Sequence, residues 1–128
     1  MEEVQAALAP YIEQARQTYP AAKKRYLENL PAGHHFFVVT RVRDKTGTQE
    51  QVFVAVSEIR NGRISGRIAS DVLGVSGFRR GDLHSFPEDE LIDWLITRPD
   101  GTEEGNVVGK ILDTSQRAPG DKWRERSR

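Results

Sequence analysis

The sequence predicts a single-domain α+β fold. An N-terminal helical segment would pack on a bent, mostly antiparallel five- to six-stranded sheet, either open or curled into a small, partly open barrel. Three observations predict this. Apolar residues recur every three to four positions before Gly33 and at every second position after it. In addition, 128 residues with 37% hydrophobic side chains are enough for one core but not for two.

The helical segment is marked by an apolar stripe and interrupted by prolines. The stripe consists of Val4, Leu8, Tyr11, Ile12, Ala15 and Tyr19. A proline breaks a helix interior but is tolerated in a first turn, so Pro10 predicts the start of the main helix and residues 1–9 an extension. Pro20 predicts a second short helix or a kink. Pro31 and Gly33 then predict the end of the helical segment.

The first three strands are predicted as consecutive antiparallel neighbours. Residues 34–43 alternate, and residues 52–57 alternate again after the polar turn at 44–48. Asn61-Gly62 favours a two-residue type I′ turn because both residues tolerate positive φ, which predicts a third strand over 63–69. Gly66 in this strand predicts a bulge or sharp bend, and therefore a curved sheet.

The rest of the chain alternates short strands with turns. We expect strands at 83–86, 92–97 and 107–112, separated by a short helix start at 88 and a turn over 98–106. Ser85 and Glu88 have the spacing of a capping box for that helix start. Residues 10–114 would form the domain, and residues 115–128, which are basic and aperiodic, a disordered tail.

Composition excludes several classes of protein. The chain has no cysteine, which excludes disulfides, Cys-ligated metals and thiol catalysis. Adjacent His34 and His35 would point to opposite faces of a strand, and the third histidine, His84, is distant, so we expect no metal and no cofactor. The acidic N-terminus and the lack of a long apolar run predict a cytoplasmic protein without membrane contact.

The charge is balanced overall but segregated along the chain. The chain contains nineteen basic and nineteen acidic residues. Residues 33–80 carry eight basic and four acidic groups, a net charge of +4. Residues 81–114 carry two basic and nine acidic groups, a net charge of −7. The preferred interpretation is that neighbouring strands of opposite charge pair within the sheet. The alternative is a surface that faces a partner.

The leading functional hypothesis is a non-catalytic protein-interaction or regulatory module, with immunity-like regulators as one form. Its partner-binding surface would comprise Asp82, Glu88, Asp89, Glu90, Asp93 and Trp94. Asp93 is expected to face solvent, whereas Trp94 is either a core residue or the anchor for an unknown protein partner. The chain would be a monomer or a weak dimer.

Two other hypotheses stay open. A single-stranded nucleic acid could bind a basic sheet face through Arg63, Arg67, Phe78, Arg79 and Arg80. A hydrolase could use two carboxylates of the acidic cluster as an acid–base pair. Nucleophile-elbow and phosphate-loop motifs are absent from the sequence. We therefore assign no catalytic residues and expect a function other than catalysis.

Three segments resemble one bacterial family. They are the run from Gly62 to Ile68, the run from Gly77 to Asp82, and Ile92-Asp93-Trp94. In this order and spacing they resemble the domain of unknown function 2314, the YegJ-like proteins, over roughly residues 11–112. The resemblance implies a helix followed by a compact, mostly antiparallel β-domain. It implies no chemistry.

Overall fold

The structure is a computed structural model that describes residues 2–108, with side chains from Leu8 onward. A helix is followed by six strands and one 3₁₀ turn. In chain order they are α1 (Glu2–Leu27), β1 (His35–Arg43), β2 (Gln49–Arg60), β3 (Arg63–Ile68), β4 (Leu83–Pro87), η1 (Glu88–Glu90), β5 (Asp93–Thr97) and β6 (Glu103–Gly105). The predicted α+β class is confirmed.

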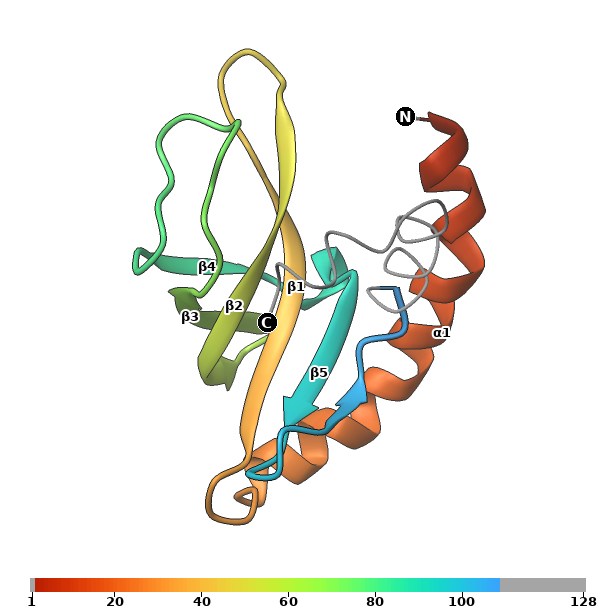
Figure 1. The fold of residues 1–128 in the computed structure, drawn as a ribbon, viewed down its shortest axis with the longest axis vertical. Helices are drawn as coiled ribbons and strands as arrows, with labels where there is room; N and C mark the ends of the chain where they lie inside the picture. Colours follow the sequence, from red (N-terminus) through yellow and green to blue (C-terminus); the bar gives the residue numbers. More distant parts are fainter. Residues whose placement is uncertain (1, 109–128) are drawn as a thin grey trace.

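The strands form one antiparallel sheet in the order β4-β3-β2-β1-β5-β6. Strands β4 and β6 lie at opposite edges, so the sheet is open and does not close into a barrel. Figure 1 shows β3 and β4 running across the direction of β1, and α1 on the side of β5. The sheet is therefore strongly bent, as the alternating pattern with a central glycine predicted.

The helix α1 is continuous through both prolines, so the predicted start of the main helix at Pro10 and the alternative of a second short helix at Pro20 are wrong. An interior proline costs about 3 kcal/mol. The burial of Leu8 and Tyr19 offsets part of this cost, because burying a large apolar side chain stabilises the fold by about 1.5–3 kcal/mol. Within residues 2–108, no helix has the length and apolar character of a membrane span.

The core lies on the face of the sheet that α1 covers, which we call the inner face. It includes Phe36, Val38, Val54, Ile64, Ile68, Phe86, Trp94 and Ile96 from the strands, and Tyr19 and Ala22 from α1. A smaller cluster joins Leu8 of α1 to Val39, Ile92 and Val108. The two clusters fix both halves of the helix against the sheet.

The β2–β3 hairpin matches the local sequence signals. Asn61 and Gly62 have φ values of 53° and 76°, as the type I′ turn requires. The pairing register shifts between Val56 and Glu58, directly beside Gly66 on β3. A Cβ on Gly66 would overlap the carbonyl oxygen of Ala55 and lie 2.8 Å from the carbonyl carbon. The predicted bulge is thus present, and it lies in β2 opposite the glycine.

Two local predictions near the C-terminal half are wrong. The capping box is absent: η1 has Pro87 at its N-cap and no side-chain hydrogen bond there. The last strand, β6, occupies residues 103–105 of the predicted turn, whereas Val107 and Val108 have helical backbone. Residues 109–112 of the predicted last strand lie outside the described residues. Asn106, with a φ of 58°, ends β6 early. The predicted tail at 115–128 lies outside the described residues.

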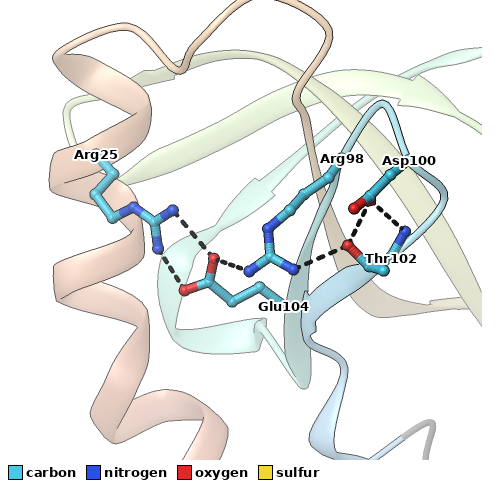
Figure 2. A network of polar contacts seen from close by, with 5 residues as sticks. All are labelled: Arg25, Arg98, Asp100, Thr102 and Glu104. Carbon is cyan, nitrogen blue, oxygen red and sulfur yellow. Dashed lines mark hydrogen bonds and ion pairs between the residues drawn. The ribbon is translucent and has the colours of Figure 1, made fainter.

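A polar network ties β6 to α1 (Figure 2). Both guanidinium NH groups of Arg25 donate to Glu104, over 2.6 and 3.1 Å. Arg98 donates to Glu104 over 2.9 Å and to Thr102 over 3.1 Å, and Thr102 donates to Asp100. The pKa of Glu104 is lowered, first by its hydrogen bond to Arg25. The network holds the β5–β6 hairpin against the end of the helix.

A second set of contacts ties the β3–β4 loop to the β1–β2 hairpin. Glu50 accepts hydrogen bonds from the backbone N–H groups of Leu73 and Gly74, the shortest being 2.7 Å. Asp44 accepts one from the N–H of Ser76 over 3.1 Å. These bonds lower the pKa of both carboxylates, with the hydroxyl of Thr46 as the largest contribution at Asp44. Two acids thus anchor one exposed loop.

Candidate functional site

Asp93 lies inside the protein, so the prediction that it faces solvent is wrong. It is only 1% exposed. Its Oδ1 accepts a hydrogen bond from the N–H of Trp94 and its Oδ2 one from the N–H of Val108, both over 2.8 Å. The alternation rule placed Asp93 on the face away from α1, but Val108 lies against that face beside Val39. Asp93 therefore holds backbone together inside the fold.

Trp94 is a core residue, the first of the two alternatives that the sequence left open. It is 6% exposed, and its ring centroid lies 6.4 Å from that of Phe36. Its indole Nε1 donates a hydrogen bond to Oγ1 of Thr18 over 2.9 Å. The tryptophan thus fixes β5 to α1 and is not exposed to a partner.

Glu88 also connects η1 to the helix. Its carboxylate accepts a hydrogen bond from the hydroxyl of Tyr19 over 2.6 Å and lies 2.8 Å from Nζ of Lys23. Desolvation opposes ionisation, but the bonds from Lys23 and Tyr19 outweigh it and lower the pKa of Glu88. Burial, then the bond to Glu88, raises the pKa of Tyr19. Glu88 is thus bound to side chains of α1, whereas Asp93 is bound to backbone N–H groups of residues 94 and 108.

The other members of the predicted acidic surface lie at different depths. Asp89 and Glu90 are exposed on η1. Asp82 is partly buried and accepts a hydrogen bond from the N–H of Arg79 over 3.0 Å. No group of three or more histidine, aspartate or glutamate side chains placed to hold a metal occurs among residues 2–108.

The predicted nucleic-acid set is divided between two faces of the sheet. The ring of Phe78 lies edge-on to His84, which stacks on the buried Phe86, so Phe78 belongs to the inner face. Arg63 and Arg67 alternate with the buried Ile64 on β3 and project from the opposite side, which we call the outer face. The structure therefore does not bring the five predicted residues together.

Arg79 and Arg80 lie in the β3–β4 loop. Arg79 is exposed and its backbone N–H is bound by Asp82. Arg80 forms an ion pair with Asp71 over 2.9 Å, with both side chains more than half exposed. Only Arg63 and Arg67 of this set are placed on the outer face of a strand.

The outer face carries exposed apolar side chains next to these arginines. We define the outer-face patch as Phe53, Arg63, Arg67 and Leu83. Arg67 is paired with Leu83 of β4 and with Ala55 of β2, two residues from Phe53, so the side chains share a face. Phe53 is 38% exposed and Leu83 69%. Aromatic residues and arginine are enriched at protein interfaces.

Hydrogen bonds orient both arginines of the outer-face patch. Nε of Arg63 donates to Oγ of Ser85 over 3.1 Å, and a terminal nitrogen of Arg67 donates to the carbonyl of Gly81 over 2.8 Å. Both acceptors are neutral. Among residues 2–108, neither guanidinium forms an ion pair.

A small hollow opens beside Phe53. It has a volume of about 150 Å³, and Val39, Gln51, Ser70 and Asp71 also line it. Oγ of Ser70 accepts a hydrogen bond from the N–H of Phe53 over 3.1 Å, which fixes the rim of the hollow. A partner could insert one side chain here, as anchoring residues do at the centre of interfaces.

The expected charge pairing within the sheet is wrong for the residues described. Acidic groups after residue 80 pair mainly with the helix: Glu88 with Lys23, and Glu104 with Arg25. The one further pair there joins Glu104 to its neighbour Arg98. In the basic stretch, Arg60 pairs with Glu58 and Arg80 with Asp71, whereas the arginines of β1 and β3 form no ion pair within residues 2–108.

Sequence reasoning missed Phe53 and Leu83 as surface residues. The apolar run from Val52 to Val54 is typical of a core segment, although Phe53 alternates with the buried Val52 and Val54. Leu83 was assigned only to a short strand. Strand alternation was the signal for Phe53, whereas β4 is an edge strand, which only the topology identifies.

A comparison with protein families gives one match. The sequence profile of a family described as an uncharacterized protein conserved in bacteria, DUF2314, covers residues 3–118. The chain belongs to this family. No curated protein and no solved structure matches the sequence or structure of this chain. Membership in DUF2314 agrees with the resemblance found in the sequence, and the description of the family assigns no activity.

Proposed function

We propose that this DUF2314 domain is a non-catalytic protein-interaction module that binds an acidic partner through the outer-face patch. The observation that carries the proposal is the exposure of Phe53 and Leu83 next to two arginines that make no ion pair among the described residues. Apolar contact would supply most of the affinity, and charge complementarity would orient the partner and speed its encounter.

A protein partner fits this patch better than a single-stranded nucleic acid. Stacking requires aromatic rings, and Phe53 is the only exposed ring of the patch, since Phe78 lies against His84 on the inner face. Leu83 offers aliphatic contact, which suits a protein side chain. The net charge of zero also argues against non-specific attraction to a polyanion.

The proposal is tested by affinity purification from the native bacterium with matched surface variants. Arg67→Glu and Leu83→Asp change the patch. Lys45→Glu, in the β1–β2 turn, and Leu73→Asp, in the β3–β4 loop, introduce the same acidic side chains on exposed residues outside it. We expect one set of proteins to bind the wild type and both controls and to be lost from both patch variants.

The interaction should then be measured with the purified partner. Arg67→Glu is expected to weaken binding at least about tenfold at low salt, because reversal places like charges together, and the difference should shrink at high salt. Partner lists that are identical for patch and control variants would refute the proposal. Recovery of RNA or DNA that requires Arg63 and Arg67 would refute it in favour of nucleic-acid binding.

A further inference from the structure

Three arginines converge on a second site, a cleft between α1, β1 and η1. Its volume is about 430 Å³, and its charged lining consists of Arg16, Arg41, Arg43, Asp89 and Glu90. We call it the arginine cleft. Arg41 and Arg43 lie on the same face of the sheet as the outer-face patch, but no residue of the patch lines the cleft.

The fold positions the arginines from two elements. Arg41 and Arg43 lie two residues apart on β1 and project from the same side of the strand. Arg16 comes from α1, and its Nε donates a hydrogen bond to the carbonyl of Leu91 over 2.8 Å. That bond anchors Arg16 and leaves its terminal nitrogens as further donors.

The cross-strand neighbours of Arg41 and Arg43 provide no counter-charge. The residues opposite them on β2 are Gln51 and Gln49, which are neutral. Glu50 lies between these glutamines and is bound to the N–H groups of the β3–β4 loop. An acidic residue opposite either arginine would stabilise the sheet, and β2 supplies none at these two positions.

The arginines therefore repel one another, and Arg41 is partly buried while Arg16 and Arg43 are exposed. Burial, followed by the like charges of Arg16 and Arg43, lowers the pKa of Arg41, which still remains protonated near neutral pH. No ion pair to Arg16, Arg41 or Arg43 occurs in the part of the chain that the structure describes. An anion that binds all three would relieve this repulsion.

The two acids indicate what else the ligand carries. Asp89 and Glu90 line the same cleft and would repel an anion placed against them. A carboxylate accepts hydrogen bonds only, so it requires donors such as hydroxyl groups from its ligand. The cleft is much larger than a phosphate ion and lies within the range of roughly 300–1,000 Å³ that is typical of small-molecule sites.

We propose that the arginine cleft binds a phosphorylated polyol, with Arg16, Arg41 and Arg43 holding the phosphoryl group and Asp89 and Glu90 accepting hydrogen bonds from its hydroxyls. A phosphoryl dianion offers three terminal oxygens, and guanidinium groups match them with parallel N–H donors. A carboxylate monoanion would neutralise less of the charge. The proposal stands apart from partner binding at the outer-face patch.

The test is an NMR titration of the ¹⁵N-labelled full chain at fixed pH and ionic strength. The probes are glucose 6-phosphate, inorganic phosphate, glucose and acetate. We expect saturable shifts around Arg41, Arg43 and Glu90 with glucose 6-phosphate, weaker binding of inorganic phosphate, and no saturation with glucose or acetate. Raising the salt concentration should weaken binding.

Variants locate the site. Arg43→Gln replaces an exposed side chain and should weaken glucose 6-phosphate binding at least about tenfold, because a charge-assisted hydrogen bond is lost. Arg60→Gln, on the exposed end of β2, is the matched control and should bind as the wild type does. Glu90→Gln should change affinity for glucose 6-phosphate more than affinity for phosphate.

Three outcomes would overturn the proposal. No saturable shifts with either phosphate probe would remove the anion site. Equal binding by wild type and Arg43→Gln would place the ligand elsewhere. Binding of phosphate as tight as that of glucose 6-phosphate would remove the role assigned to the hydroxyls and to Asp89 and Glu90. None of these results affects the proposed partner surface, which is tested with Arg67 and Leu83.

Discussion

The hydrogen bond between Trp94 and Thr18 should couple β5 to α1 energetically. Nε1 of the indole donates to Oγ1 of Thr18 over 2.9 Å, and the ring is 6% exposed. Thr18→Val keeps the shape and β-branching of the side chain but removes the acceptor. Trp94→Phe removes the donor. The two substitutions and their combination form a double-mutant cycle.

The magnitude follows from which group is left unpaired. Thr18→Val leaves a buried indole N–H without an acceptor, which costs about 1–3 kcal/mol. The hydroxyl of Thr18 also donates to the carbonyls of Gln14 and Ala15, over 3.2 and 3.1 Å, but the substitution leaves the backbone of the helix intact. In the Trp94→Phe background no N–H remains, so Thr18→Val should cost little. The expected coupling energy is at least about 1 kcal/mol.

The free energy of unfolding would be measured for all four proteins by urea titration, followed by far-UV circular dichroism. Thr18→Val should lower it clearly in the wild type and only slightly when it is combined with Trp94→Phe. Gln17→Ala, an exposed position on α1, controls for changes in helix propensity. Additive effects, within about 0.5 kcal/mol, would refute the coupling of helix and sheet through this bond.

Two further substitutions test the sheet and the β6 network. Gly66→Ala should lower the free energy of unfolding by at least about 2 kcal/mol, because its Cβ overlaps the backbone of β2. Gly74→Ala is the control: its Cβ would lie 3.6 Å from its nearest neighbour, so the free energy of unfolding should change little. Equal losses of stability for the two variants in the same urea assay would contradict the steric argument. Glu104→Gln should cost about 1 kcal/mol at pH 7, since its pairs with Arg25 and Arg98 are partly exposed and screened. The pKa of Glu104 is lower in the folded state, so this difference should be full above about pH 4.3, the unfolded value, and vanish as the pH falls through the folded value. A difference that persists at pH 2 would show that the ion pairs are not its source.

Local signals predicted most of the sheet. Asn61 and Gly62 determine a turn by their own φ preferences, and alternation in residues 36–42 reflects burial on one face of a strand. The continuity of α1 escaped prediction because it depends on tertiary contacts of Leu8 and Tyr19 that offset the cost of two prolines. Propensity acts within a few residues, whereas those contacts join distant segments.

The candidate sites were harder to predict because they depend on which faces become covered. Asp93 reads as a solvent-facing residue in an alternating strand, and only the position of Val108 buries it. The arginine cleft needs Arg16 beside Arg41, residues that lie on different elements. The sequence shows that both are basic but not that they meet. The segregated charge along the sequence did not show where these charged groups gather in the fold.

The attachment of the β3–β4 loop to the β1–β2 hairpin has a consequence for how this protein tolerates change. Exposed loops usually accept insertions and deletions without cost elsewhere. Here Glu50 and Asp44 bind the backbone of residues 73–76, so the position of the β3–β4 loop depends on that of the β1–β2 hairpin. Lengthening the hairpin would displace the loop as well. A change in the length of one segment is therefore expected to require a matching change in the other.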